Sequence, residues 1–266
     1  MGAESLWFLC LGTLSVLALT AGMWLAARSR RWAWQGMSLA LLCLVLWVWL
    51  NRHPSVAVHL IPLHWLAQVE GTGAVPFFMF IMGVLWQRSA LPRQRRVTVL
   101  AMGLGVVYFL NGGLWMLQTT PRSLPGQTIP GDITWQSVDF SCVPAACATA
   151  LNRLSVPTTE AEMAHLTRTR PGFGATMIRA MDGLTRKLQS TGWRVIFVQP
   201  TYEELRLYPM PALTPIQTGT TLRHLVVLDG ITPEGVHITD PQVGKTFLNA
   251  ADFQRVYCHQ AIVFDR

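Results

Sequence analysis

Charged residues are scarce in this sequence of 266 residues, at 13% of the chain against 51% hydrophobic residues. The scarcity is confined to the first 120 residues or so, which are almost continuously apolar, whereas the remainder has the mixed composition of a water-soluble domain. Internal repeats and low-complexity tracts are also absent, which argues against a repeat architecture. We therefore expect two unlike parts, the first in a membrane and the second in water.

Basic residues are missing from the N-terminus, where the only early charge is Glu4. A cleaved signal peptide normally begins with positive charge, so the apolar run Leu6–Ala27 is expected to stay as a membrane span, with cleavage as the alternative. About four transmembrane helices are expected, because crossing a hydrocarbon core of roughly 30 Å takes some twenty apolar residues. The other three runs are Ala33–Leu50, Gly71–Trp86 and Val97–Leu117.

Positive charge is in excess, but it is gathered in two short gaps between apolar runs. The net charge is +7 at pH 7, and seven arginines match it: Arg28, Arg30, Arg31, Arg88, Arg93, Arg95 and Arg96. Arginines in short loops between spans mark the cytoplasmic side, so the pattern indicates membrane topology and not nucleic-acid binding. We expect a multi-pass protein of the inner (cell) membrane, with everything after Leu117 periplasmic or extracellular.

A third metal ligand is missing where two histidines occur close together. The segment Val56–Ala67 is too short to cross a membrane and is broken by Pro62, so it is expected to lie at the interface or to dip into the bundle. His59 and His64 flank the proline without a carboxylate at helical spacing. Interfacial histidines are favoured over metal ligands, and no metal or organic cofactor is implied by the sequence.

Proline and glycine are frequent in residues 119–133, which have no apolar period and are expected to form an extended spacer. The spacer would join a membrane domain at residues 1–118 to a soluble domain at 134–266. Helices are expected from Cys142 to about Leu154, from the cap-like Pro157–Glu160 through Leu166, and from Met177 towards Gly192.

Strands are expected to follow these helices, which predicts an α+β domain with helices packed on an antiparallel sheet. Pro215 is expected at a sheet edge or strand end, because proline cannot donate to a ladder. A hairpin turn is expected at Thr232–Gly235. The expected strands are Trp193–Val198, Ala212–Gln217, Leu222–Ile231, Val236–Asp240, a segment around Phe247 and Leu248, and Tyr257–Phe264.

Four residues of this domain form a candidate catalytic set. Cys142 begins the first helix, where the positive end of the helix dipole favours a thiolate, and Gln136 could supply a donor to an oxyanion. His224 opens a strand and Asp240 ends the next one, so a base and its orienting carboxylate fall on neighbouring strands. Taken singly each residue has an ordinary structural reading, and the strand register is not fixed by the sequence.

The soluble half resembles the papain-like cysteine peptidases that trim double-glycine leaders from bacteriocin precursors. The resemblance covers about Thr134–Phe264 and rests on Gln136, on Cys142-Val143-Pro144-Ala145-Ala146, on Gly172 and Gly174 between two helices, on His224 to Gly230, and on Asp240 to Gly244. It implies Cys142 as nucleophile, His224 as general base and acid, Asp240 as its orienting partner, and Gln136 with the Cys142 backbone N–H as oxyanion donors.

Three departures from the family pattern leave alternatives open. Val143 stands where the family usually has glycine, Ser141 stands where it has aspartate, and no ATP-binding transporter module is expected from these 266 residues. The favoured function is a membrane-anchored cysteine peptidase acting outside the cytoplasm. The alternatives are a papain-like amidase or transferase on cell-envelope peptides, and a non-catalytic membrane sensor or binding protein with a vestigial site. Expected partners are a peptide or protein substrate, membrane lipid and a membrane-embedded protein.

The other cysteines carry less information. Cys10 and Cys43 lie in apolar runs and are expected to be packing residues. Cys147 and Cys258 could form a disulfide in an exported domain, or could equally be two buried thiols.

Overall fold

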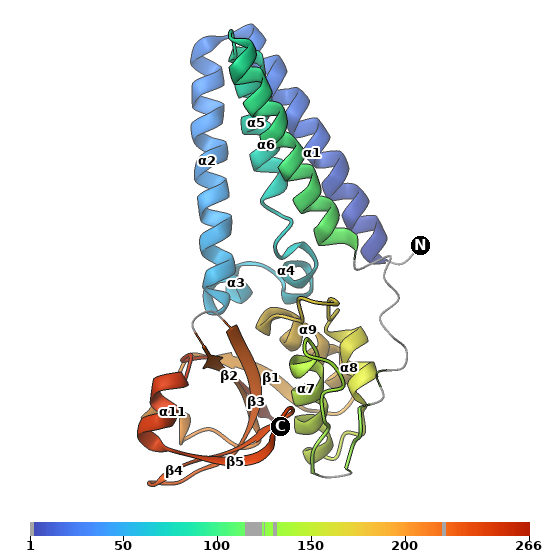
Figure 1. Cartoon of the computed structure of the whole chain (residues 1–266), viewed down its shortest axis with the longest axis vertical. Coiled ribbons are helices and arrows are strands. Elements are labelled where there is room, and N and C mark those ends of the chain that lie inside the picture. Colours follow the sequence, from blue (N-terminus) through green and yellow to red (C-terminus); the bar gives the residue numbers. More distant parts are fainter. Residues whose placement is uncertain (1–2, 115–123, 125, 130–131, 220–221) are drawn as a thin grey trace. The chain divides into compact units, whose positions relative to one another are not determined.

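Helices form the described part of the first unit, and a helix-flanked sheet forms the second. The computed structural model describes residues 3–114, 124, 126–129, 132–219 and 222–266. Contacts divide the chain into Met1–Gln118 and Thr119–Arg266 (Figure 1). The helices of the first unit are α1 (Ala3–Arg28), α2 (Arg30–Arg52), α3 (Pro54–Leu60), α4 (Leu63–Val69), α5 (Val75–Arg88) and α6 (Pro92–Leu114).

Helices α1 and α5 make the closest contact of the first unit, through glycines. A Cβ placed on Gly22 of α1 would lie 2.3 Å from the carbonyl oxygen of Phe80, and one on Gly83 of α5 would lie 2.2 Å from that of Leu19. Only residues without a side chain allow two helix backbones to approach this closely. Small residues at a helix–helix contact are typical of packing in membranes, where apolar surface burial provides little drive for association.

The spans expected from the sequence are found only in part. Within the described residues, two helices are long and apolar enough to cross a membrane, Leu6–Arg28 and Arg30–Arg52, and Val75–Arg88 is a shorter apolar helix. The fourth expected span, 97–117, runs past Leu114 into residues outside the described part. The segment between the second and third apolar runs is two short helices, α3 and α4, separated at Pro62 as expected.

The second unit begins with a buried helix. Helix α7 (Cys142–Arg153) is followed by α8 (Glu160–Leu166) and α9 (Met177–Leu188), as expected. Residues 143–151 of α7 are buried, and four of them are alanines, so neighbouring elements can approach the helix closely. Figure 1 shows α7, α8 and α9 grouped on one side of the sheet. The N-terminus of α7, which carries Cys142, is therefore fixed against the sheet by the burial of the whole helix.

The sheet is antiparallel and has the strand order β1-β6-β2-β3-β4-β5. The turn Thr232–Gly235 joins β3 and β4 as expected, closed by a 2.8 Å hydrogen bond from the Thr232 N–H to the Gly235 carbonyl. A register shift between Leu228 and Gly230 interrupts the β3–β4 ladder. The strands are β1 (Arg194–Val198), β2 (Ala212–Thr218), β3 (Leu222–Ile231), β4 (Gly235–Asp240), β5 (Gly244–Asn249) and β6 (Ala261–Asp265).

The end of the chain differs from the expectation. The predicted strand Tyr257–Phe264 was wrong at its start, because helix α11 (Ala250–Val256) ends there and strand β6 begins only at Ala261. Asn249 caps α11 by accepting a 2.9 Å hydrogen bond from the Asp252 N–H. Asparagine is among the preferred N-cap residues, so the signal for this helix start is present in the sequence. A four-residue helix, α10 (Tyr202–Leu205), was also not predicted.

Pro215 lies in an interior strand, which corrects the expectation of an edge. It belongs to β2, between β6 and β3, and pairs with Leu225 of β3. The ladder between β2 and β6 contains only the pair Leu213 and Ile262. Pro215 lies two residues past Leu213, where β6 is no longer paired with β2. The missing N–H of Pro215 therefore interrupts no β2–β6 ladder.

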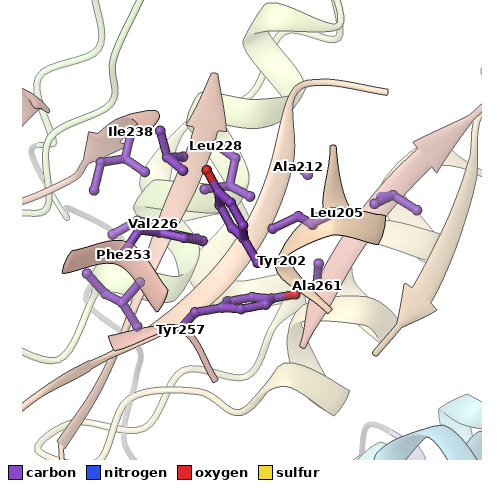
Figure 2. Close-up of a cluster of buried hydrophobic side chains, with 12 residues drawn as sticks. Tyr202, Leu205, Ala212, Val226, Leu228, Ile238, Phe253, Tyr257 and Ala261 are labelled. Atoms are coloured by element: carbon purple, nitrogen blue, oxygen red, sulfur yellow. The ribbon is translucent and has the colours of Figure 1, made fainter. Parts of the chain in front are cut away.

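An aromatic and aliphatic core fills one face of the sheet beneath α10 and α11 (Figure 2). The Phe253 and Tyr257 rings stack with centroids 5.2 Å apart, and the Tyr257 hydroxyl donates a 3.0 Å hydrogen bond to the Pro200 carbonyl. Val226 and Leu228 of β3 belong to this core. The strand that carries His224 is thus held by buried neighbours only two residues away.

The expected spacer is in part folded against the second unit, which corrects its description as extended. Of residues 119–133, the structure describes 124, 126–129, 132 and 133. The Ile129 N–H donates to the Ile133 carbonyl at 2.8 Å, and the Trp135 N–H donates to the Gln127 carbonyl at 3.0 Å. Residues 127–129 are therefore paired with residues 133–135, directly before Gln136.

Candidate active site

Cys142 is the first residue of α7 and is half-buried. The turn before it is held by Ser141, whose hydroxyl donates a 2.8 Å hydrogen bond to the Val138 carbonyl. Burial would raise the pKa of the Cys142 thiol, but a hydrogen bond to His224 and the charge of His224 outweigh it and lower the pKa below that of an ordinary thiol. Cys142 is therefore the thiol in this unit that is suited to ionise.

Two backbone groups also stabilise the Cys142 sulfur. The N–H groups of Leu225 and Val143 bond to it and lower its pKa further. Val143 needs no glycine-like freedom for this role, because it is an ordinary helical residue with a buried side chain. The departure from the family pattern at this position is thus compatible with an activated thiolate.

His224 lies between the thiol and a carboxyl group. Its Nε2 is 2.7 Å from Oδ1 of Asp240, which leaves Nδ1 for the sulfur of Cys142. Burial would lower the pKa of His224, but the hydrogen bonds and charges of Asp240 and Cys142 raise it from 6.5 to about 9. The arrangement favours an imidazolium beside a thiolate over the two neutral groups.

Asp240 is oriented by the turn that follows it. Its Oδ1 accepts a 2.7 Å hydrogen bond from the backbone N–H of Gln242. Burial would raise the pKa of Asp240, but the hydrogen bond from His224, that from Gln242 and the charge of His224 hold it below its usual range. An aspartate side chain that accepts from the N–H two residues on is a common turn, and the Asp-Pro pair was the sequence signal for it.

The strand register explains how two distant residues meet. In the β3–β4 ladder Val227 pairs with Thr239, so Val226 comes opposite Asp240 one step further along. His224 is two residues from Val226 and shares its face of the strand, which makes it the diagonal neighbour of Asp240. Diagonal positions are within reach of long side chains.

Gln136 reaches the same corner of the molecule through its backbone. Its N–H donates a 3.0 Å hydrogen bond to the carbonyl of Pro241, the residue after Asp240. Its side-chain oxygen is buried without a hydrogen-bond partner among the described residues. In three of the four residues singled out in the sequence, side-chain contacts run from Cys142 to His224 and from His224 to Asp240. The fourth, Gln136, is joined to them by the main chain.

Comparison with known proteins matches this unit to one family. Residues 132–266 match the model described as "Peptidase C39 family". An uncharacterized protein of Methanothermobacter thermautotrophicus is 31% identical over 134 residues, which make up 50% of this chain and 88% of that protein. A second, from Methanothermobacter marburgensis, is 30% identical over the same coverage.

The chain belongs to the peptidase C39 family. It is a cysteine peptidase, and therefore a hydrolase. The family match begins at residue 132, so the first unit lies outside it.

Solved structures similar to this C39 peptidase include two peptidase domains of transporters. A double-glycine motif protease from an AMS/PCAT transporter, in complex with the leader peptide, is 17% identical with a TM-score of 0.43, covering 50% of this chain and 89% of that one. The peptidase domain of Streptococcus ComA, a bi-functional ABC transporter, is 20% identical with a TM-score of 0.44, covering 50% and 96%.

The remaining cysteines of the C39 unit are free thiols in the structure. Cys147 is fully buried in α7, and burial, with a smaller contribution from the charge of Cys142, raises its pKa. Cys258 is half-buried and follows the end of α11. A thiol whose pKa is raised is a poor nucleophile, so Cys147 does not compete with Cys142 for an electrophile.

Proposed function

We propose that Cys142, His224 and Asp240 form the catalytic triad of this cysteine peptidase. The observation that carries the proposal is the continuous chain of contacts from the Cys142 sulfur through His224 to Asp240. In this mechanism the thiolate attacks the carbonyl carbon of a peptide bond, and His224 gives its proton to the departing amine. His224 then removes a proton from the water that hydrolyses the acyl-enzyme, while Asp240 orients the ring throughout.

Gln136 and the backbone N–H of Cys142 are proposed to stabilise the oxyanion of the tetrahedral intermediate. What supports this role is the bond between the Gln136 N–H and Pro241, which ties the glutamine segment to the residue beside Asp240. Donors aimed at developing negative charge typically contribute a rate factor on the order of 10²–10³ each. The substrate is proposed to be a peptide, since a similar protease was crystallised with its leader peptide.

The first unit is proposed to anchor the peptidase with four membrane spans, and residues 1–118, 119–133 and 134–266 to be membrane domain, connecting segment and peptidase domain. Only 11% of the apolar stretch in the helix Leu6–Arg28, and 17% of that in the helix Arg30–Arg52, is buried within the protein. Helix α6 exposes Leu100, Leu104 and Val107 in the same way. Soluble proteins rarely expose apolar surface of this extent, which supports lipid as the surroundings of α1, α2, α5 and α6.

The peptidase unit is proposed to lie outside the cytoplasm. The Tyr108 hydroxyl of α6 donates a 2.5 Å hydrogen bond to the Gly71 carbonyl before α5, and the Phe109 ring stacks on Phe8 near the start of α1. The starts of α1 and α5 therefore share one end of the first unit, and their arginine-bearing ends share the other (Figure 1). Seven arginines at one end support a cytoplasmic location for that end.

A thiol-reactive probe tests the proposed triad on the whole protein in detergent. Iodoacetamide labelling, located by peptide mass, is expected to be fast at Cys142 at mildly acidic pH, absent in Cys142→Ala and slow in His224→Ala. Labelling of Cys142 that rises only near pH 8–9, as for an ordinary thiol, and ignores His224 would contradict the proposal. It would favour instead a binding or sensor protein with a vestigial site.

Intact cells test the proposed side of the membrane. A charged maleimide that does not cross membranes is expected to label Cys142 from outside, with Cys142→Ala as the control for the other four cysteines. Where the host has an outer membrane, it is first made permeable. Labelling that requires disruption of the inner membrane would place the peptidase in the cytoplasm and overturn this part of the proposal.

A further inference from the structure

A buried carboxyl group lies beside the segment that carries Gln136. Glu160, the first residue of α8, is 1% exposed. One of its oxygens accepts a 2.9 Å hydrogen bond from the Ser137 N–H, and the other accepts a 2.5 Å bond from the Ser137 hydroxyl. Both oxygens are thus engaged by the residue that directly follows Gln136.

Capping of α8 does not account for this arrangement. The helix is capped by Thr159, whose hydroxyl accepts from the Glu162 N–H. The other acidic residue of the first turn, Glu162, is exposed and forms an ion pair with Lys187 at 2.6 Å. Burying an acidic group is costly unless its oxygens are hydrogen-bonded, so the contacts of Glu160 bind it specifically to Ser137.

The main chain around Gln136 is consequently fixed on both sides. Before Gln136, the Trp135 N–H donates to the Gln127 carbonyl. The N–H of Gln136 itself donates to the Pro241 carbonyl. After it, Ser137 is held twice by Glu160. Removing the contacts of Glu160 would leave the direction of the Gln136 side chain constrained from one side only.

The folded part of the connecting segment closes over Glu160. A Cβ on Gly126 would lie 2.3 Å from Oε2 of Glu160 and 2.9 Å from the carbonyl of Trp135. Only glycine fits at this distance, so residues 126–129, the glutamate and the segment of Gln136 pack as one block. Their packing leaves the Glu160 carboxyl little room to turn away from Ser137.

We propose that Glu160 is a positioning residue: through its two hydrogen bonds to Ser137 it holds Gln136 in the orientation that donates to the oxyanion. This inference rests on the proposed role of Gln136 in the active site. It assigns Glu160 no contact with the substrate. A displacement of about 1 Å in a catalytic group can cost roughly 10²-fold in rate, so the loss of one support should be measurable.

The test compares two reactions of Cys142 in the full-length protein in detergent. Iodoacetamide alkylates the thiolate by displacement of iodide, and no oxyanion develops. With the peptide aldehyde acetyl-glycyl-glycinal, the thiolate adds to the carbonyl carbon of the aldehyde. The carbonyl oxygen then becomes the oxyanion or, after protonation, a hydroxyl. Aldehyde affinity, read as protection of Cys142 from alkylation, therefore depends on the oxyanion donors, whereas the alkylation rate does not.

Glu160→Ala and Gln136→Ala are each expected to weaken aldehyde affinity by about 10-fold or more. In Glu160→Ala the alkylation rate and its pH profile should stay unchanged within about twofold. Glu160→Gln should retain most of the affinity, because a glutamine can bond both groups of Ser137. The double variant Gln136→Ala with Glu160→Ala should be no weaker than Gln136→Ala alone, since Glu160 acts through Gln136. Glu162→Gln, the matched control on the same turn, should change neither reaction.

Several results would overturn the inference. Unchanged aldehyde affinity in Glu160→Ala, together with a loss in Gln136→Ala, would refute the positioning role of Glu160. It would leave the proposed function intact. An additive loss in the double variant would mean that Glu160 acts independently of Gln136. An alkylation rate that falls with the affinity would make Glu160 a general structural residue; if Glu160→Ala fails to fold, Ser137→Ala removes one bond without emptying the site. Slow alkylation of the wild-type protein would instead refute the proposed function.

Discussion

Nε2 of His224 lies 2.7 Å from Oδ1 of Asp240, across 16 residues of sequence and from one strand to the next. The same oxygen accepts the N–H of Gln242 at 2.7 Å, so the carboxyl group cannot rotate away without losing two bonds. The second ring nitrogen is thereby directed to Cys142. The orientation of the histidine is thus set before any substrate arrives.

Alkylation of Cys142 and hydrolysis of a peptide should depend on pH in different ways. Cys142 has a lowered pKa and His224 a raised pKa of about 9. Alkylation needs only the thiolate, so its rate should rise at mildly acidic pH and then stay level. Peptide hydrolysis also needs the protonated imidazole, so kcat/KM should fall again as pH passes about 9. Hydrolysis that continues to rise above pH 9 would show that His224 does not supply the proton.

Replacing Asp240 by asparagine should make His224 a weaker base. The hydrogen bond and charge of Asp240, together with those of Cys142, raise the pKa of His224 against its burial. With the charge gone that pKa should fall by about one unit or more, and the pKa of Cys142 should rise because its ion-pair partner is less often charged. The alkylation onset in Asp240→Asn should move to higher pH, though less far than in His224→Ala.

Asp265→Asn is the control for that shift, because Asp265 is an acidic strand residue that forms an exposed ion pair with Arg194. Its alkylation profile should match the wild type. If the alkylation profile of Asp240→Asn also matched the wild type, the carboxyl group of Asp240 would not act on His224.

Secondary structure was largely predictable in the second unit because its signals are local. The start of α7 at Cys142, the cap before α8 and the turn at Thr232–Gly235 each depend on a few neighbouring residues. Helix α11 has the same kind of signal in Asn249 and Asp252, although it was not among the predicted helices.

The contacts of the site were less predictable because they join distant segments. The order of Gln136, Cys142, His224 and Asp240 suggested a catalytic set, but the register shift between Leu228 and Gly230 is invisible in the sequence. The bonds between Glu160 and Ser137 span 23 residues and depend on how α8 packs against the loop before α7. No local pattern distinguishes that buried glutamate from the exposed Glu162.

Thr149→Val should destabilise the peptidase unit without touching the site directly. The Thr149 hydroxyl accepts a 2.9 Å hydrogen bond from the Thr134 N–H, and both residues are buried. Valine has nearly the same shape but leaves that N–H without an acceptor, at a cost on the order of 1–3 kcal/mol. Thermal unfolding of the full-length protein followed by circular dichroism should show a lower midpoint. Thr246→Val, at an exposed position of β5, should leave the midpoint unchanged, and equal midpoints for the two variants would contradict the prediction.

Leucine at Gly22 or Gly83 should separate α1 from α5. A Cβ at either position would collide with a backbone carbonyl of the facing helix, at 2.3 Å from Phe80 and 2.2 Å from Leu19. Backbone cannot move aside as a flexible side chain does, so the helices must part, and overpacking of this kind typically costs about 1–3 kcal/mol.

Gly103→Leu is the matched control for those two variants, because nothing lies within 4 Å of a Cβ at Gly103 on α6. Heated in detergent, Gly22→Leu and Gly83→Leu should aggregate at lower temperature than wild type, whereas Gly103→Leu should not. Cys142 alkylation should stay at the wild-type rate in all three below the aggregation temperature, because the second unit has its own core. Equal aggregation temperatures for Gly22→Leu and Gly103→Leu would mean that the close approach of α1 and α5 does not stabilise the first unit.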